Sequence, residues 1–223
     1  MSVYSGEELA TIDLIVDALY TGFKTDKGGV VDPLVRLVGV SRQGGFRYRG
    51  TRDRPTLLVL TSNLAEADWP DELDPTTGRF IYYGDNRQSG QQLHDTPRFG
   101  NLLLKSVFDL AHSGRRKEVP PILIFTSESP GRSFRFRGLA VPGHPAMPAT
   151  EDLVAVWKTA NAERFQNYRA VFTILDEAVI SRDWVHAMGS RMPCDVQAPI
   201  VKQRATLSRL GVETASNSFH LSV

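Results

Sequence analysis

The chain has 223 residues, of which 41% are hydrophobic and 23% charged, and its formal net charge is +1. These values are typical of a globular protein, which at this length buries about 70% of its unfolded surface. Neither a run of about 18 apolar residues nor a basic and then apolar N-terminal segment is present, so we expect no membrane span and no secretory signal. The single cysteine, Cys194, excludes an internal disulfide and a cysteine-rich zinc site. We therefore expect a cytoplasmic protein.

The N-terminal part predicts a helix, and short strands follow it. Ser5 and Glu8 have the spacing of a capping box, and apolar residues then recur at helical spacing, which predicts a helix over residues 6–22. Six runs rich in β-forming residues come next, at 55–61, 79–83, 121–125, 133–137, 153–157 and 169–175. The run at 133–137 alternates strictly between two residue classes, which predicts a strand with one buried face.

Three further segments have helical patterns, over residues 100–111, 183–188 and 200–210. Since the predicted strands and helices do not alternate, a doubly wound parallel sheet is disfavoured. We predict an α+β fold, a curved, partly open and mostly antiparallel β-barrel flanked by helices. Hydrophobic density falls after about residue 178, so we expect one domain over 1–180 and a helical C-terminal extension over 181–223.

Basic residues form three clusters in this nearly neutral chain. They lie between Arg36 and Arg54, at Arg115 to Lys117, and between Arg132 and Arg137, whereas acidic residues concentrate at 66–74. Such separation is expected when one face follows a phosphate backbone, and the preference for arginine suits phosphate binding. Each cluster taken alone is also compatible with a solvated loop.

Common catalytic signatures are missing. The sequence has no Walker A motif, dinucleotide fingerprint, nucleophile elbow or HExxH motif. Its five histidines are scattered without metal-ligand spacing, and Pro70-Asp71 is followed by no acidic-x-Lys tripeptide of a metal-dependent nuclease. We therefore expect no catalytic residues, no metal and no cofactor.

Five polar segments instead have compositions that suit ligand binding. A Gly-Gly turn at 42–47 allows close backbone approach, and a tryptophan amid acids at 68–74 offers a stacking face and carboxylates for a base edge. An aromatic strand enters a Gly-Asp-Asn turn at 80–87, and polar residues at 93–101 open a helix whose N–H groups suit phosphate. Residues 164–169 add further rings and donors. Each segment alone is also compatible with an ordinary turn.

Together these segments resemble a known family. The motifs are GGFR from Gly44, WPDELD from Trp69, YYGDN from Tyr82, LHDTPRFGN from Leu93, VPPILIF from Val119, FRGLAVPG from Phe136 and RFQNYRAVFT from Arg164. In this order they resemble the N-terminal domain of the AspBHI-type modification-dependent restriction endonucleases, over roughly residues 10–185. That domain is similar to the SRA domain, a curved β-barrel that reads methylated cytosine by flipping it out of the duplex.

The resemblance implies a pocket for one flipped base, with Trp69 and Tyr82 as stacking faces and Asp71 accepting from the cytosine amino group. The expected pocket residues are Trp69, Asp71, Tyr82, Tyr83, Gly84 and Asp85. The expected duplex-inserting loop comprises Gln43, Gly44, Gly45 and Arg47. The expected contacts to phosphate are Asn86, Arg87, His94, Arg98, Asn101, Arg164, Asn167 and Arg169.

The function implied is binding of double-stranded DNA that contains modified cytosine, with 5-methylcytosine as the first expectation. Full-length relatives carry a nuclease domain, so the resemblance implies that this chain works with a nuclease domain or subunit. It also implies a bacterial cytoplasmic protein that has no membrane partner. Three alternatives stay open: a glycosylase-like enzyme using Asp71 or Asp85, an RNA-binding relative, and a reader of hydroxymethylcytosine or of a phosphorothioate backbone.

Overall fold

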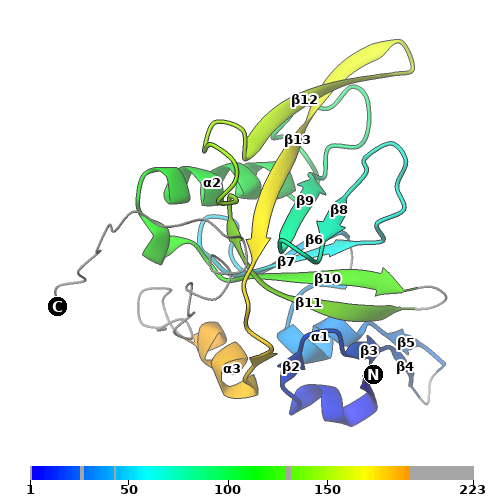
Figure 1. The fold of residues 1–223 in the computed structure, drawn as a ribbon. Helices are drawn as coiled ribbons and strands as arrows, with labels where there is room; N and C mark the ends of the chain where they lie inside the picture. Colours follow the sequence, from blue (N-terminus) through cyan, green and yellow to red (C-terminus); the bar gives the residue numbers. More distant parts are fainter. Residues whose placement is uncertain (1, 26–27, 43, 129–131, 191–223) are drawn as a thin grey trace, which may run out of the picture.

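A ten-stranded sheet organises the computed structural model, which describes residues 2–25, 28–42, 44–128 and 132–190. The main path through the sheet runs β6-β7-β10-β11-β13-β9-β8 (Figure 1). Its strands are β6 (Phe46–Gly50), β7 (Pro55–Ser62), β8 (Glu72–Asp74), β9 (Arg79–Tyr83), β10 (Ile122–Glu128), β11 (Ser133–Pro142) and β13 (Glu163–Ile174). Off this path, β12 (Leu153–Ala160) pairs with β13, and β3 (Leu19–Thr21) joins β1 (Val3–Ser5) to β11.

The smaller elements surround this sheet. Two short pairs join β2 (Leu14–Ile15) to β14 (Val179–Ile180) and β4 (Phe23–Lys24) to β5 (Val30–Val31). The helices are η1 (Gly6–Ala10), α1 (Pro33–Val38), α2 (Gly100–His112), η2 (Arg116–Glu118) and α3 (Arg182–Ser190).

Pairing in the large sheet is antiparallel except for β7 with β10 and β1 with β3. The predicted α+β class and the predominance of antiparallel pairing are therefore confirmed. The path has two ends, β6 and β8, so the described strands form no closed barrel. A barrel-like curvature remains a prediction.

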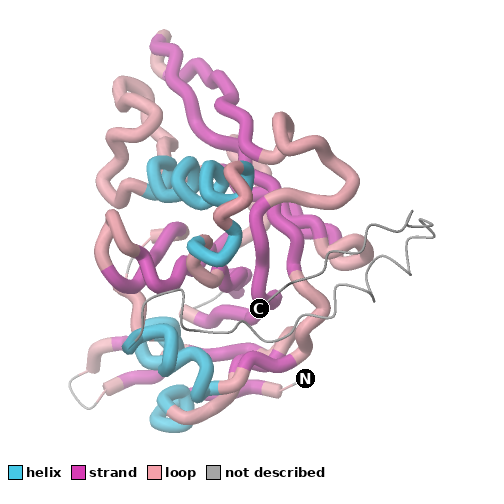
Figure 2. The backbone as a smooth tube through the Cα atoms, turned by 90° about the vertical axis from the view of Figure 1, so that its left-hand side faces the viewer, coloured by secondary structure: helices cyan, strands magenta, loops and turns pink. Residues whose placement is uncertain are grey.

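The parallel pair β7–β10 is buried on both faces. Alternate residues Leu57 and Val59 point into a first hydrophobic core, whereas Leu58 and Leu60 point into a second. Because both faces of each strand are buried, β7 and β10 each have a continuous apolar run in the sequence and no alternation of apolar and polar residues. In Figure 1, α2 lies on one side of β10 and β11, and α1 and α3 lie on the other. The quarter-turn view of Figure 2 keeps this separation.

The predicted N-terminal helix over 6–22 is wrong. The hydrogen bond from the Ser5 backbone N–H to Glu8 Oε1 (2.6 Å) forms as a capping box requires, but η1 ends at Ala10. The chain then turns through Asp17, whose φ is +62°, and β3 pairs with β11. The buried Tyr20 hydroxyl holds this turn by donating to the Asp13 carbonyl (2.9 Å). Long-range pairing thus overrides a helical pattern.

The other predicted elements have clear outcomes. All six predicted strand runs overlap observed strands, which are β7, β9, β10, β11, β12 and β13. The run at 121–125 starts one residue before β10, and the run at 169–175 ends one residue after β13, which itself begins before 169. The helices at 100–111 and 183–188 are confirmed as α2 and α3, and the helix at 200–210 lies outside the described residues. The short α1 and β6, and the pairs β2–β14 and β4–β5, were not predicted. No helix in the described part of the chain is long and apolar enough to cross a bilayer.

The start of the predicted C-terminal extension packs on the first core. Val185 of α3 is buried there, and the Arg182 backbone N–H donates to Asp13 Oδ1 (2.7 Å). The division into 1–180 and 181–223 remains a prediction.

Candidate functional site

A cavity of about 410 Å³ opens where several strand ends meet. Its volume lies in the range typical of small-molecule pockets. Its lining comes from segments far apart in sequence: Gly44, Gly45, Phe46, Thr61, Ser62, Asn63, Glu66, Asp71, Tyr82, Gly84, Asp85, Arg87, Pro97, Arg98 and Ser127. Four of the six predicted pocket residues are among them.

Asp71 and Tyr82 are both buried groups of this lining. The Asp71 carboxylate accepts a hydrogen bond from the Tyr83 backbone N–H (2.7 Å), and only 7% of Asp71 is exposed. Burial raises the pKa of Asp71, while hydrogen bonds from Ser62 and Tyr83 and the nearby charge of Arg87 oppose that rise. Burial also raises the pKa of the Tyr82 phenol, which therefore stays neutral. The cavity thus combines a desolvated carboxyl group with an aromatic ring.

Trp69 and Tyr83 lie outside the cavity lining. Because neighbouring residues of a strand point to opposite faces, Tyr83 points away from Tyr82. Its ring lies 5.6 Å from the Trp69 ring, which also contacts Phe165 at 5.9 Å between centroids. Lys158 Nζ covers the indole at 4.9 Å, leaving Trp69 6% exposed. In this structure Trp69 packs between Tyr83, Phe165 and Lys158, and its role as a stacking face for a base remains a prediction.

Gly84 forms one wall of the cavity, where no side chain would fit. A Cβ atom at this position would lie 1.7 Å from Asn101 Oδ1 and 2.8 Å from Asn167 Oδ1. The Gly84 carbonyl accepts a hydrogen bond from Asn167 Nδ2 (3.0 Å). The glycine therefore lets two buried amides approach the backbone of the wall.

Asp85 caps α2 from a distant segment. Phe99, at the N-cap position, has φ of +55° and makes no side-chain cap. Asp85 instead accepts from the Gly100 N–H (2.9 Å), the Asn101 N–H (2.9 Å) and the Thr96 hydroxyl (2.8 Å). A carboxylate at a helix N-terminus is favoured by the helix dipole. The helix start predicted to bind phosphate is thus occupied by a carboxylate of the protein itself.

Three asparagines predicted to contact phosphate are buried structural residues. Asn86, Asn101 and Asn167 are each 0% exposed. Each side-chain amide donates to a backbone carbonyl, those of Gln166 (2.8 Å), Leu93 (2.8 Å) and Gly84 (3.0 Å) respectively. No solvent reaches these residues, so in this structure they position the wall, and their contact with phosphate remains a prediction.

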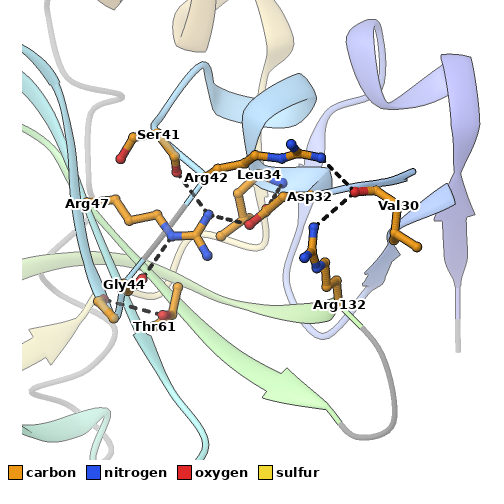
Figure 3. A network of polar contacts seen from close by, with 10 residues as sticks. Val30, Asp32, Leu34, Ser41, Arg42, Gly44, Arg47, Thr61 and Arg132 are labelled. Atoms are coloured by element: carbon orange, nitrogen blue, oxygen red, sulfur yellow. Dashed lines mark hydrogen bonds and ion pairs between the residues drawn. The ribbon is translucent and has the colours of Figure 1, made fainter. Parts of the chain in front are cut away.

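Gly44 and Gly45 form the opposite wall, which an ion pair holds. A Cβ on Gly45 would lie 3.1 Å from the Thr61 carbonyl oxygen and 3.3 Å from the Tyr82 hydroxyl oxygen. Arg47 donates to the carbonyls of Gly44 (3.0 Å) and Ser41 (3.1 Å) and pairs with Asp32 at 2.7 Å (Figure 3).

The Arg47 and Asp32 side chains are only 4% and 3% exposed. Arg47 is therefore an anchor of this wall, and its place in a duplex-inserting loop remains a prediction. Gln43 lies outside the described residues.

The remaining predicted contacts fall into two groups. Exposed Arg87 and half-buried Arg98 line the cavity, and the Arg98 side chain packs against Gly44. Away from the lining, Arg164 stacks on exposed Trp157 at 4.6 Å. Arg169 lies half-buried on β13, and His94 Nε2 lies 3.0 Å from the Tyr168 hydroxyl.

Sequence reasoning missed the polar ends of two strands. Ser62 ends β7 and Ser127 lies near the end of β10, and the Ser127 hydroxyl donates to the Ser62 carbonyl (3.4 Å). Both apolar runs end in Thr-Ser, a signal that has meaning only once the strands are known to be parallel neighbours. The described residues include no group of three side chains suited to hold a metal ion.

Comparison with known proteins shows the family of the chain. The family described as "Restriction endonuclease AspBHI N-terminal" matches residues 14–204. The chain is similar to the solved structure of the "DNA modification-dependent restriction endonuclease AspBHI", with a sequence identity of 69% and a TM-score of 0.86. The match covers 89% of this chain and 92% of that chain.

A second structure, the "DNA recognition domain of the cytosine modification-dependent restriction endonuclease LpnPI", is 46% identical, with a TM-score of 0.78 over 84% and 85% of the two chains. The MspJI restriction endonuclease shares the fold at 18% identity and a TM-score of 0.61, over 92% of this chain and 56% of that chain. No curated protein is a significant match. The chain therefore belongs to the family of AspBHI-type restriction endonuclease N-terminal domains.

Proposed function

We propose that this chain is a recognition module that binds double-stranded DNA containing modified cytosine, with the modified base turned out of the duplex into the cavity. The names of two relatives support the choice of ligand: one is modification-dependent, and the other is a DNA recognition domain of a cytosine modification-dependent enzyme. The observation that carries the proposal is the desolvated Asp71 carboxyl beside Tyr82 in the cavity of such a family member.

Asp71 provides the chemistry that distinguishes cytosine from thymine. The cytosine edge presents an amino donor where thymine presents a carbonyl oxygen, and a carboxylate oxygen accepts from the amino group only. The Tyr83 N–H and the Ser62 hydroxyl use two acceptor positions of Asp71. A carboxylate has about four acceptor positions, so capacity for a base edge remains.

Tyr82 and the glycine walls suit a flat ligand. Stacking of a base on an aromatic ring contributes about 1–3 kcal/mol, which is comparable with the cost of extruding one base. Gly44, Gly45 and Gly84 present backbone in place of side chains, which allows a ligand to approach the walls closely. The cavity would then distinguish modified from unmodified cytosine by how the added methyl group fits between these walls.

Cleavage is assigned to a nuclease domain or subunit outside this chain, in the manner of the restriction endonucleases to which its family belongs. A glycosylase-like reaction would need a carboxylate free to act on the sugar. Asp85 already accepts from three protein donors, which disfavours it in that role.

The test is an affinity panel on one duplex that carries cytosine, 5-methylcytosine or 5-hydroxymethylcytosine at a single position. We expect tighter binding to a modified duplex, and fluorescence of a 2-aminopurine placed beside the modified base should rise as that base leaves the stack. Equal affinity for all three duplexes would overturn the proposal.

A matched pair of variants tests the role of Asp71. Asp71→Asn should bring the modified-to-unmodified affinity ratio close to one, because the neutral amide loses the charged acceptor and presents an NH2 donor beside its one oxygen, so it no longer holds the amino group of a flipped cytosine as a carboxylate would. Asp68→Asn removes the same charge three residues earlier, from a side chain that is 79% exposed, and should keep the ratio.

A further inference from the structure

Two arginines from different basic clusters converge on one backbone carbonyl. Arg42 Nη2 and Arg132 Nη1 donate to the Val30 carbonyl oxygen at 2.8 and 2.9 Å (Figure 3). Both side chains are exposed, and they are 90 residues apart in the sequence. The fold therefore brings two cationic groups together at one point on the surface.

Within the described part of the chain, this pair has no carboxylate partner, unlike its neighbours. On β11, which begins directly after Arg132, Arg135 pairs with Glu128 and Arg137 pairs with Asp17. Asp32, two residues after Val30, is directed inward to Arg47 and to the Leu34 N–H. Each guanidinium has five N–H donors, and the carbonyl takes one from each, so most donors of Arg42 and Arg132 remain for an external acceptor.

The pair lies at the same edge of the molecule as the cavity without lining it. Arg42 comes two residues before Gly44, and Arg132 follows the end of β10, where Ser127 lines the cavity. The Gly22 N–H donates to the Arg132 carbonyl (2.9 Å), which fixes the backbone at that position. A DNA strand whose base enters the cavity would therefore pass close to the two guanidinium groups.

We propose that Arg42 and Arg132 together bind one backbone phosphate of DNA flanking the modified base. Two like charges held at a shared carbonyl repel one another, and an anion between them removes that repulsion. Guanidinium groups match phosphate oxygens with paired hydrogen bonds. The inference rests on the proposed function, because it assigns the phosphate to the same bound DNA.

The experiment measures affinity for modified and unmodified duplexes at several salt concentrations, with Arg42→Gln, Arg132→Gln and the double variant. Each single variant should weaken binding to both duplexes by the same factor, about tenfold. The double variant should lower the salt slope by about 0.9, the value for one phosphate contact. Its loss of affinity should be smaller than the product of the two single losses, because both arginines serve one phosphate.

Arg116→Gln is the matched control. Arg116 is an exposed arginine on η2, before β10 begins, whereas Arg132 follows the end of that strand. The seven residues of β10, which span about 23 Å, lie between the two positions in the chain. The control should leave affinity and salt slope near those of the unchanged protein.

An Arg42→Lys, Arg132→Lys double variant tests the guanidinium geometry. It keeps both charges, so it should restore most of the salt slope and only part of the affinity.

The proposal fails if the glutamine variants behave like Arg116→Gln, or if their losses multiply and the slope falls by about 1.8, which would indicate two separate phosphates. It also fails if the modified-to-unmodified ratio collapses in these variants. In each case a retained preference of the unchanged protein for modified DNA would leave the proposed function standing. Equal binding of both duplexes by the unchanged protein would instead reject the proposed function.

Discussion

The two walls of the cavity are held by different physical means. The Gly44–Gly45 wall depends on a buried ion pair between Arg47 and Asp32, whose charges are almost completely removed from water. The Gly84 wall depends on neutral buried amides and on a carboxylate, Asp85, that faces the N-terminus of α2.

In each wall, glycines line the cavity, and a buried side chain donates a hydrogen bond to a glycine carbonyl. The polar residues of the motifs therefore mainly hold the walls in place, and fewer of them than the sequence suggested are free to contact a ligand. The two walls should respond differently to substitution, since one depends on charge and the other on shape and hydrogen bonding.

The largest effect should follow from removing one charge of the buried pair. Asp32→Asn keeps an oxygen for the Leu34 N–H but leaves the Arg47 guanidinium buried without a counter-charge. Breaking a buried pair costs about 3–5 kcal/mol, and we expect the free energy of unfolding in urea to fall by that amount. Glu118→Gln breaks the exposed pair with Arg115 and should leave unfolding unchanged. Similar unfolding of the two variants would show that the first wall does not depend on charge.

A shape change should break the second wall. In Gly84→Ala the new methyl group collides with Asn101 and Asn167 and displaces their hydrogen bonds, for an expected loss of about 3 kcal/mol. Gly29→Ala is the control, because its Cβ would meet only Thr25 Oγ1 at 3.5 Å. Thermal unfolding compares the two. Equal melting temperatures would contradict the tight packing of this wall.

A smaller loss should come from the cap of α2. Asp85→Asn retains one acceptor oxygen but directs an amide group at donors from Thr96 and the helix, so we expect a loss of about 1–2 kcal/mol in chemical unfolding. Asp109→Asn, on the same helix, removes an exposed partner of Lys105 and should change little. Equal losses of unfolding free energy in the two variants would show that the Asp85 cap does not stabilise α2.

The smallest effect should be a pH dependence from Asp71, which lines the cavity together with both walls. Burial raises the pKa of Asp71 in the folded protein, so protonation favours folding. This contribution is complete below the unfolded pKa of about 3.9 and is lost as pH rises through the folded pKa. Asp71→Asn lacks it, so the free energy of unfolding of the variant relative to the unchanged protein should rise with pH over that window and then level off. Urea titrations across the window measure this difference, and a constant or falling difference would contradict the sign.

Local sequence patterns predicted the elements whose buried residues follow a regular spacing within one segment of the chain. The apolar runs in β7 and β10 and the helical period of α2 each bury residues at a fixed spacing, so they could be recognised without a partner. Leu9 and Ile12 show the same spacing, but the pairing of β3 with β11 imposes an extended chain soon after them.

Site residues were harder to assign than site segments. Four of the predicted pocket residues, Asp71, Tyr82, Gly84 and Asp85, do line one cavity. Asn101 and Arg47 have the chemistry of nucleic-acid contacts, yet burial turns them to backbone carbonyls and, for Arg47, to Asp32. Residue type alone does not reveal burial, so their roles could not be read from the chain.

The sequence by itself determined where the longer apolar runs become strands and which family motifs occur in order, since each depends on neighbours along the chain. Tertiary structure alone decided that β7 and β10 run parallel, that Asp85 caps α2, and that Arg42 meets Arg132. These pairings depend on topology and register, which set the distances between residues far apart in sequence.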